Sequence, residues 1–388
     1  MHGGRLGGMD RRYADPEGLW SMPVDVPYAK AVRAGGLIAT CGQCPLDARG
    51  AVLAPDDPGR QAELAMGYVE RVLAELGAGL ADLVRLVVFH SADDEPALLA
   101  RIRRRLPGPT LPSVVPVRLP YLYYPGMRIE IDAVAQLGGP RSATAADDAP
   151  FPAAVRAGGM IHTSARAAPE AGDDPLRQLD AALDALERAL GALGAGLDDV
   201  VKLTTCYRQD LPWRDLARRR ADRFRHRWPV ISDVPLPRLG APGAAVSLDA
   251  IALPGAPRRS VAPPDESSWP VPLPHPPALR AGPLLFIGAQ SALTASGAVA
   301  TPGEMVPQTR ACMDRIGRLL AAEGLGFDDA LKLNTFYVGA ARGEDLHANL
   351  AIRSARFSRP GPASTGVPVE ALPFPGAMIQ VEMLAVGL

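Results

Sequence analysis

Apolar positions along this chain form a pattern that occurs three times in the same order. Large apolar residues at helical spacing occupy 66–76, 179–193 and 316–320, and a glycine follows each stretch. This spacing predicts an amphipathic helix, and a glycine after the last turn is typical of a helix end. A short run of β-branched and aromatic residues comes next, which predicts a buried strand. The chain therefore contains three similar helix–strand segments.

Other short motifs repeat together with these helices. A segment with glycine, aspartate and a basic residue precedes each strand, as GLADLVRL (79–86), GLDDVVKL (196–203) and GFDDALKL (326–333). A hairpin-like segment precedes each helix, at 31–43, 154–166 and 278–290. Alternating apolar and polar residues, typical of a half-buried strand, close each repeat at 125–135, 242–252 and 375–385. Four landmarks in a constant order indicate three copies of one α/β unit.

The expected organisation is a tandem of these three units. We predict a flexible tail over 1–20, units over 21–137, 150–254 and 271–388, and linkers over 138–149 and 255–270. Both linkers are rich in proline, alanine and serine and lack periodicity. Each unit is predicted to run β-β-α-β-α-β-β. A sheet with helices on one face must cover its other face, so the units should form a pseudo-threefold ring with sheets inside and helices outside.

Composition narrows the range of partners. The formal net charge is −1, which argues against a nucleic-acid partner because phosphate contacts need an excess of lysine and arginine. Basic runs at 101–105 and 218–227 fit exposed helix faces better than an RNA-binding surface. No stretch approaches the ~18 apolar residues of a membrane helix, and no signal-peptide core is present. We expect a cytoplasmic protein without a membrane partner.

The cysteines predict neither disulfides nor a metal site. Four cysteines in 388 residues do not make a disulfide framework. Cys41 and Cys44 form a CxxC pair, but a redox pair is expected at a helix N-terminus and zinc needs a second pair of ligands. We expect no metal and no cofactor.

The order and spacing of the landmarks resemble the Rid (YjgF) family, also called L-PSP endoribonuclease-like proteins. The resemblance is carried by VPYAKAV…GGLIATCGQCPLDARG in the first unit, by the Gly-x-x-Asp-Val-Val-Lys segments and by the Val-Pro…Leu-Pro…Pro-Gly…Glu-Ile-Asp-Ala endings. It implies chorismate-mutase-like units that assemble as trimers with ligand clefts at the three junctions. Its best-known members hydrolyse enamines and imines. An arginine binds the substrate carboxylate, a glutamate on the last strand positions water, and a tyrosine helps close the cleft.

The family arginine is missing from this chain. The family places it in a Pro-Ala-Arg segment shortly before a Val-x-Val run. Alignment of the three Val-Pro pairs, which begin at Val115, Val234 and Val367, puts other residues there: Pro112, Ile231 and Ser364. None of these can bind a carboxylate as an arginine does. The loss of all three argues against the standard imine-deaminase mechanism.

The other two family positions are partly retained. Glu130 keeps the glutamate in the first unit, where the other units have Ser247 and Gln380. The tyrosine position holds Tyr28, then Phe151, then His275. Because family clefts combine residues from two units, Glu130, Tyr28 and His275 are the candidate catalytic residues of one specialised cleft, with Phe151 as a ligand-binding candidate. The alternative roles are a strand carboxylate paired with Arg128 and an exposed linker histidine.

A tyrosine cluster is a further candidate for ligand binding. The Val-Pro alignment gives the first unit two extra residues before Gly126, within the segment that contains Tyr121, Tyr123 and Tyr124. These rings fit either an aromatic wall for an unsaturated ligand or a hairpin that packs on a neighbouring unit.

Three charged residues complete the candidates. Arg118 and Arg238 follow the Val-Pro segments and could replace the lost arginine, although arginines in surface turns are common. Asp233 is a second acidic candidate.

The leading hypothesis is a cofactor-independent hydrolase or lyase for a small carboxylated or unsaturated metabolite. Its chemistry would be hydrolysis, elimination or tautomerisation, possible steps of a biosynthetic pathway, and chorismate-cleaving enzymes also look like fused Rid-type trimers. One alternative is a metabolite-binding or scaffolding protein without catalysis, and another is an enamine or imine deaminase with a non-standard site. We expect a monomer, because the three units already satisfy each other's junctions.

Overall fold

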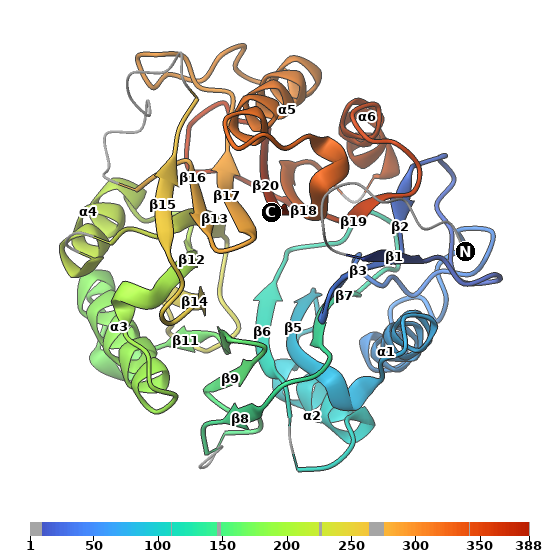
Figure 1. The fold of residues 1–388 in the computed structure, drawn as a ribbon, viewed down its shortest axis with the longest axis horizontal. Coiled ribbons are helices and arrows are strands. Elements are labelled where there is room, and N and C mark those ends of the chain that lie inside the picture. The colour runs from blue at the N-terminus through green and yellow to red at the C-terminus, as the bar shows by residue number, and fades with distance from the viewer. Residues whose placement is uncertain are drawn as a thin grey trace.

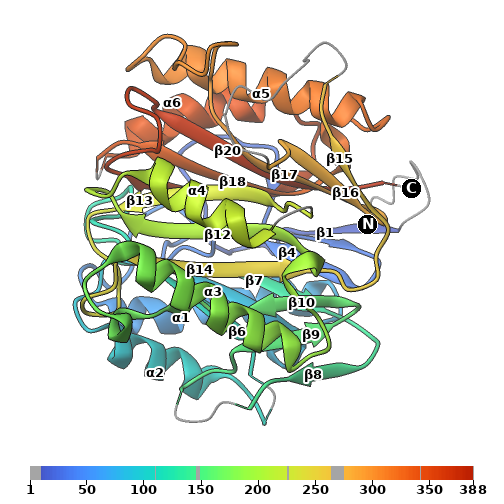
Figure 2. The ribbon, with the colours of Figure 1, turned by 90° about the vertical axis from the view of Figure 1, so that its left-hand side faces the viewer.

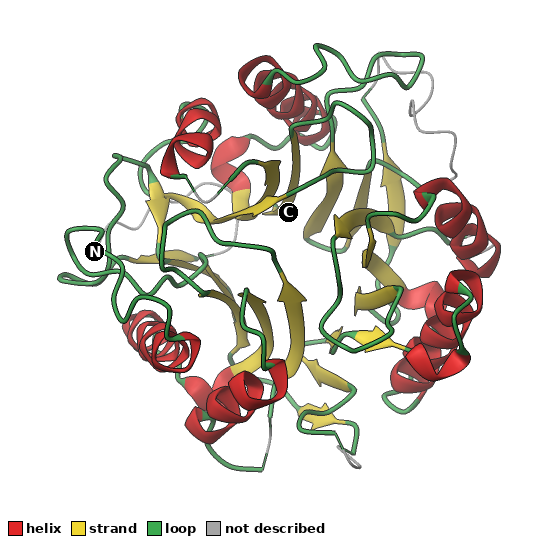
Figure 3. Ribbon diagram, turned by 180° about the vertical axis from the view of Figure 1, so that it is seen from behind, coloured by secondary structure: helices red, strands yellow, loops and turns green. Residues whose placement is uncertain are grey.

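The computed structural model describes residues 10–109, 111–145, 149–224, 227–263, 275–340 and 342–387. These residues form three α/β units, each with one mixed sheet and two α-helices, which confirms the predicted fold class. Figure 1 shows the units around a common centre, with strands toward the centre and helices at the periphery. The view from behind shows the same outer ring of helices (Figure 3).

Apart from the two-residue strands β2 and β11, the strands and α-helices follow one order in all units. The first unit contains β1 (Arg11–Ala14), β2 (Tyr28–Ala29), β3 (Ala31–Ala34), β4 (Leu37–Thr40), α1 (Pro58–Glu75), β5 (Leu83–His90), α2 (Glu95–Arg105), β6 (Ser113–Arg118) and β7 (Ile129–Gln136). The second contains β8 (Arg141–Ala143), β9 (Ala154–Ala157), β10 (Met160–Thr163), β11 (Arg166–Ala167), α3 (Pro175–Gly191), β12 (Val200–Arg208), α4 (Trp213–Phe224), β13 (Val230–Leu236) and β14 (Val246–Ala252). The third contains β15 (Arg258–Val261), β16 (Ala278–Ala281), β17 (Leu284–Gln290), α5 (Met305–Ala321), β18 (Ala330–Val338), α6 (Gly343–Ser354), β19 (Gly361–Val369) and β20 (Ile379–Val386).

Local sequence explains where the helices and turns begin. Asp57 and Asp174 cap α1 and α3, because their carboxylates accept backbone N–H bonds of the first turn that have no helical partner. Each Gly-x-x-Asp motif forms a short 3-10 turn in which the aspartate accepts the glycine N–H at 2.8–3.0 Å, as Asp82 does from Gly79. Buried apolar residues line the inner face of each first helix, and Figure 2 shows α3 lying along the outside of its sheet.

The three sheets share one strand order. Their central strands run β4-β7-β5-β6, β10-β14-β12-β13 and β17-β20-β18-β19. The last two strands in each series are parallel, and the α-helix between them, α2, α4 or α6, makes the crossover.

The predicted tail and linkers contribute strands to these sheets. Arg11–Ala14, expected in a flexible tail, instead forms β1 and pairs with β3, while residues 1–9 lie outside the described residues. The linkers contribute β8 and β15 as equivalent strands, and 146–148 and 264–270 of the linkers are outside the described part. The first arginine of each strand donates to the preceding unit around the ring: Arg11 to Asp329 O, Arg141 to Ala81 O and Arg258 to Asp198 O. These segments therefore hold neighbouring units together.

Buried ion pairs join each unit to the next. Arg85 of the first unit pairs with Asp249 of the second, and Lys202 of the second pairs with Glu382 of the third. Lys332 of the third unit closes the ring on Asp132 of the first at 2.7 Å. The basic residue of each repeated motif thus bonds an acid on the last strand of the next unit. All three pairs line a central cavity of about 110 Å³.

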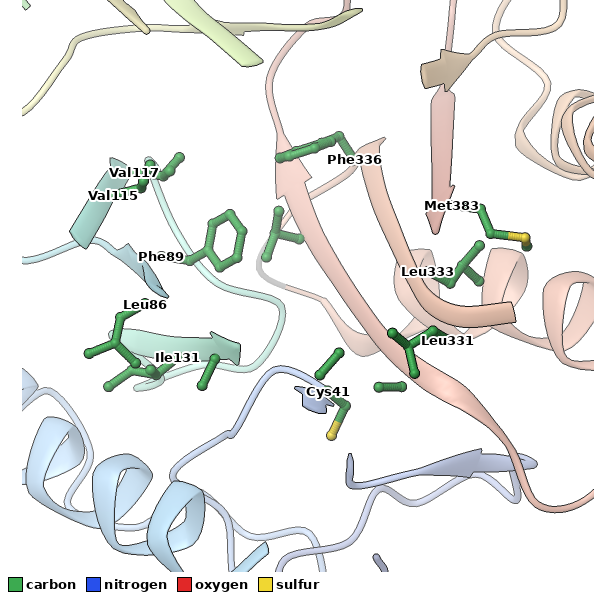
Figure 4. Packing of buried hydrophobic residues seen from close by; sticks show 14 of the residues in the cluster. Cys41, Leu86, Phe89, Val115, Val117, Ile131, Leu331, Leu333, Phe336 and Met383 are labelled. Atoms are coloured by element: carbon green, nitrogen blue, oxygen red, sulfur yellow. The ribbon is translucent and has the colours of Figure 1, made fainter. Parts of the chain in front are cut away.

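Apolar side chains fill much of the space between units. Phe89 of β5 and Phe336 of β18 meet edge to face, with ring centroids 6.3 Å apart. Figure 4 shows these rings with Val115, Val117 and Met383 in the same cluster. Burying this surface supplies the main driving force that holds the units together.

Strand register corrects the alignment used for the family arginine. Leu86, Leu203 and Leu333 end the same motif and pair with Val114, Ile231 and Ser364. The family position in the first unit is therefore Val114 and not Pro112. On this register Val117 matches Val234 and Val367, so the two extra residues before Gly126 disappear. The Val-Pro pair of the first unit misled the alignment because it lies two residues earlier on its strand.

Most described arginines of the two basic runs lie on exposed helix faces as predicted, but Arg220 of the second run is buried. Arg101 pairs with Glu63 and Arg219 with Asp180 across the two helices of their units, at 3.2 and 2.6 Å. Residues 225 and 226 of the second basic run are outside the described part. Among described residues, no helix is long and apolar enough to span a membrane.

Candidate functional site

A cavity of about 400 Å³ lies where the third unit meets the first. The first unit contributes β7, the turn after β4 and the segment 15–30, and the third contributes α6 and β19. Cys44, Tyr123, Glu130, Arg353 and Ser364 are among its lining residues. This cavity therefore contains the glutamate that the sequence singled out.

Glu130 lies on β7 and is only 2% exposed. Its carboxylate packs over Gly42, where a Cβ would collide with Oε1. At the sequence position of Gly42 the other units have Ala165 and Ala289, and at the position of Glu130 they have the shorter Ser247 and the uncharged Gln380. Burial, reinforced by the charge of Asp132 and opposed by Lys332, raises the pKa of Glu130 to about 8. At neutral pH the group is mostly a protonated acid.

Tyr28 is held at this junction by backbone pairing. Its two-residue strand β2 runs parallel to β19 of the third unit, and Gly361 N donates to Pro27 O at 2.7 Å. The hydroxyl is buried and has no hydrogen-bond partner within the described residues. Burial raises the pKa of Tyr28, so the hydroxyl remains a neutral donor. The family tyrosine position of the first unit thus faces the same cavity as Glu130.

Arg353 supplies a cation that the sequence analysis did not find. It lies on α6, is fully buried and lines the cavity. Nε donates to Asn349 Oδ1 at 2.9 Å, and one terminal nitrogen donates to Ser364 Oγ at 3.2 Å. The other terminal nitrogen, Nη2, has no partner, and no carboxylate of the described residues pairs with the guanidinium. Because Ser364 occupies the family arginine position, the helix places a guanidinium beside the site from which the strand arginine was lost.

Four buried polar atoms at this junction lack a protein partner among the described residues: Tyr28 Oη, Glu130 Oε2, Arg353 Nη2 and Tyr337 Oη. Tyr337 lies on β18, and its pKa is raised by burial and by the nearby Glu130, against the effect of Arg353. Buried polar groups are normally hydrogen-bonded, so this cluster indicates a place for ligand or water.

Residues 15–26 form one wall of the cavity. Trp20 is buried, its indole N–H donates to Gln43 Oε1 at 3.0 Å, and Lys30 Nζ lies 3.5 Å from its ring centroid. Asp25 pairs with Arg359 of the third unit at 2.6 Å, which fastens this wall across the junction.

The three tyrosines of the cluster have different roles: one lines the cavity, and two contact the neighbouring unit. Tyr123 is buried and lines the cavity beside Glu130. Tyr121 donates to Gly339 O, and Tyr124 bonds His347 Nε2 at 3.0 Å. Both outer tyrosines therefore join the first unit to the third.

The remaining candidates lie at other junctions. Arg118 and Arg238 both pair with Asp93, at 2.8 and 3.3 Å, and neither lines the cavity. Phe151 is buried at the start of the second unit. His275 lies near Arg220 and Asp233, where burial and the Arg220 charge lower its pKa to about 4. The structure thus unites Glu130, Tyr28 and Tyr123 but separates them from His275.

The other two junctions are closed at the corresponding place. Between the first and second units, Val114 N donates to Ser164 Oγ and Ala165 N donates to Val114 O, at 2.9 and 3.2 Å. Between the second and third units, Arg220 makes two bonds to Asp233 at 2.6 and 3.0 Å, and Gln380 Nε2 donates to Asp233 O at 3.0 Å. At these two junctions protein groups bond one another, whereas at the third–first junction Arg353 Nη2 has no partner among the described residues.

A spacing in the sequence could have revealed Arg353. It precedes Ser364 by eleven residues, and Arg220 precedes Ile231 by the same number. In the first unit this position is Arg103, which is exposed and donates to Pro150 O at 2.9 Å. Because Arg353 lies on α6, the strand motif of the family does not mark it.

The fold defines a class of protein: fused α/β units that close on one another, here with a cavity between the third unit and the first. The model of the family described as endoribonuclease L-PSP matches residues 21–137 and 272–387, more than half of the chain. The chain belongs to this Rid/YjgF/L-PSP family, as its sequence indicated.

Several known proteins are similar to parts or most of the chain. A RutC family protein of Pyrococcus abyssi is 27% identical over 109 residues, which cover 28% of this chain and 85% of that protein. A YjgF/YER057c/UK114 family member of Mycobacterium tuberculosis, Rv2704, is 30% identical and matches 29% of this chain and 99% of its own, with a TM-score of 0.28. A solved chorismatase is 14% identical but covers 79% of this chain and 93% of its own, with a TM-score of 0.56. The last similarity shows a shared multi-unit fold.

Proposed function

We propose that this chain is a hydrolase for a small, unsaturated carboxylate that binds between the third and first units. The carrying observation is that one cavity contains a buried carboxylic acid and a buried guanidinium that pairs with no carboxylate among the described residues. A charge buried without a partner is costly, so a ligand carboxylate is the natural complement of Arg353. The described side chains and water suffice for the chemistry proposed below.

Glu130 is suited to start the reaction as an acid. Its raised pKa keeps a proton on the carboxyl at neutral pH, and Oε2 has no hydrogen-bond partner in the described part of the chain. With the substrate carboxylate on Arg353, Glu130 would protonate the electron-rich carbon of an enol ether or enamine. Water then adds to the resulting cation while the Glu130 carboxylate accepts its proton, and the adduct breaks down to a carbonyl compound and an alcohol or amine. The carboxyl returns protonated, so the cycle balances.

The cavity wall supports a substrate larger than a three-carbon acid. Trp20, Met22 and Val24 lie on one side, and Leu346 and Leu350 of α6 lie on the other. These apolar groups would pack on the body of the ligand while Arg353 holds its charged end.

Deamination of an enamine or imine is a second candidate function. Arg353 bonds Ser364, the family arginine position of the third unit, and so restores a cation that the sequence analysis considered lost. The reasoning against imine-deaminase chemistry depended on that loss.

Two variants test the proposed function. The purified chain would be assayed with carboxylated enol ethers and with 2-aminoacrylate generated in place, following carbonyl product and ammonia. Glu130→Gln should lower kcat by about 10²–10⁴ while ligand affinity is retained. Arg353→Gln should weaken ligand binding by ~100-fold or more, because a charge-assisted pair is lost. Arg118→Gln, outside the cavity, is the matched control.

The outcomes separate the competing functions. Turnover of enol ethers supports the hydrolase, and ammonia release from 2-aminoacrylate supports the deaminase. Binding that depends on Arg353, without turnover of either class, would indicate a metabolite-binding protein. Activity that survives both variants would place the site elsewhere.

A further inference from the structure

Two polar side chains beside Glu130 have no part in the proposed reaction so far. Tyr123 Oη and Cys44 Sγ lie 2.8 Å apart, and each residue is only 1% exposed. Both line the cavity that contains Glu130. The Cys44 thiol also donates to Gly42 O at 3.3 Å, and Gly42 is the residue over which the Glu130 carboxylate packs. These side chains therefore form one buried cluster.

The donor inventory of this cluster suggests a function for Tyr123. The thiol has a single proton, which can go either to Gly42 O or to the Glu130 carboxyl. The Tyr123 hydroxyl also has one proton, which can go to Cys44 Sγ or to Glu130. The hydroxyl forms only a moderate hydrogen bond to a neutral carboxyl, but a much stronger one to a buried carboxylate.

We infer that Tyr123 is a switchable positioning residue for Glu130. Its hydroxyl donates to Cys44 Sγ while Glu130 holds its proton, and it turns to the carboxylate once that proton has moved to the substrate. Tyr123 thereby stabilises the charge that develops on Glu130, and Cys44 acts as its resting acceptor. This inference rests on the proposed acid function of Glu130.

The cluster is confined to the unit that has the carboxylate. At the matching positions the second unit has Gly240 and Ala167, and the third has Pro373 and Ser291. Neither of these units can form the tyrosine–cysteine contact, and neither has a glutamate to serve. Tyr124, the next residue along, bonds His347 instead and offers a matched control.

Several other titratable groups lie near Glu130 and influence its pKa. Asp132 lies on the same strand, while Lys332 and Tyr337 approach from β18 of the third unit. Cys41 and Cys44 approach from the turn after β4, and burial raises the pKa of both thiols. Both thiols stay protonated over the range in which Glu130 titrates, so Cys44 remains a neutral neighbour of the carboxyl.

Infrared difference titration of the free protein tests this inference without a substrate. The protonated-carboxyl band that disappears in Glu130→Gln belongs to Glu130, and its midpoint should lie near pH 8. Tyr123→Phe should raise that midpoint by about one to two pH units, because the ionised form loses a donor. Tyr124→Phe should leave it unchanged, and Cys44→Ser, which keeps an acceptor, should stay close to wild type.

A second readout uses unmodified Tyr123. In the wild type a tyrosine ring mode should shift with the same midpoint as the Glu130 band, and this coupled shift should be absent in Glu130→Gln. An unchanged midpoint in folded Tyr123→Phe, or a tyrosine signal independent of Glu130, overturns the inference. A wild-type midpoint near 4.5 would instead overturn the acid function of Glu130. A shift in Tyr123→Phe would still show that the hydroxyl bonds the carboxylate.

Discussion

Two junctions of the ring differ in the surroundings of a matching arginine. Arg220 lies at the junction between the second and third units, and Arg353 lies at the junction between the third and the first. Arg220 and Arg353 each lie on the second helix of a unit, eleven residues before the matching strand position, and both are buried. Arg220 meets Asp233 in a two-bond ion pair. The residue that matches Asp233 in the third unit is Gly366, so Arg353 faces a cavity instead of a carboxylate.

One side chain, Asp233 or Gly366, therefore decides whether the arginine is held in an internal ion pair or faces the cavity and is available to a ligand. Gly366 lies against Arg353, and a Cβ there would stand 3.4 Å from Nη2. A second contrast lies across the cleft, where Gly42 leaves room for Glu130, whereas the third unit has Ala289 and Gln380 at the two matching sequence positions. Fusion of the units permits this divergence, because each junction can change without changing the other two.

The two arginines should differ most in what they contribute to stability. Arg220→Ala should lower the free energy of unfolding by about 3–5 kcal/mol, because Asp233 would remain buried without its cation. Arg353→Ala should change stability far less, since no carboxylate that the structure describes loses a partner. Urea unfolding followed by circular dichroism measures both. Equal losses would mean that Arg353 has an internal anionic partner after all, and the contrast between the junctions would fail.

The pH dependence of stability should reveal Glu130. Its pKa in the folded protein is raised from 4.5 to about 8, so folding favours the protonated form. The contribution of protonated Glu130 to the free energy of unfolding is fully present below about pH 4.5 and is lost as the pH rises toward 8. Glu130→Gln cannot ionise, so relative to wild type it should gain about 2–4 kcal/mol between pH 5 and pH 9.

Glu382, whose pKa is lowered in the folded protein, serves as the control for this pH dependence. Lys202, Ser232 and Asn334 lower the pKa of Glu382 against the effect of burial. Glu382→Gln should therefore destabilise at neutral pH, with a penalty that shrinks as pH falls through the pKa of Glu382. A flat pH response of Glu130→Gln relative to wild type would show that Glu130 ionises normally in the folded chain.

The sequence predicted much of the fold because repetition made each element visible three times. The Gly-x-x-Asp turns and the alternating last strands needed only local spacing. The strands β1, β8 and β15 were missed, since their short segments lack periodicity and obtain their hydrogen bonds from a neighbour. Such strands are determined by tertiary pairing, which local composition does not report.

The candidate site was predicted in part for a similar reason. Glu130 and Tyr28 occupy strand positions that the family motif marks, and the structure places both at one cavity. Arg353 was missed because a long side chain on a helix can reach the site of a residue lost from a strand. The Val-Pro pairs gave the wrong position for the first unit, although glycine spacing from Val117, Val234 and Val367 would have given the right one.

The smallest of these effects should come from exchanging the residues that distinguish the two junctions. Gly366→Asp places beside Arg353 the carboxylate that Asp233 offers to Arg220, so it should occupy the clamp and weaken ligand binding by about 10–100-fold, or ~1.4–2.8 kcal/mol. Gly366→Asn adds similar bulk without the charge and separates occupation of the clamp from steric filling. Calorimetric titration with the best substrate from the activity panel measures the affinity of both variants.

If Gly366→Asp and Gly366→Asn both bind the ligand as tightly as wild type, the ligand carboxylate does not use Arg353. If both lose affinity equally, bulk explains the loss. A loss confined to the aspartate would show that a carboxylate at this position is what separates the closed junction from the open one.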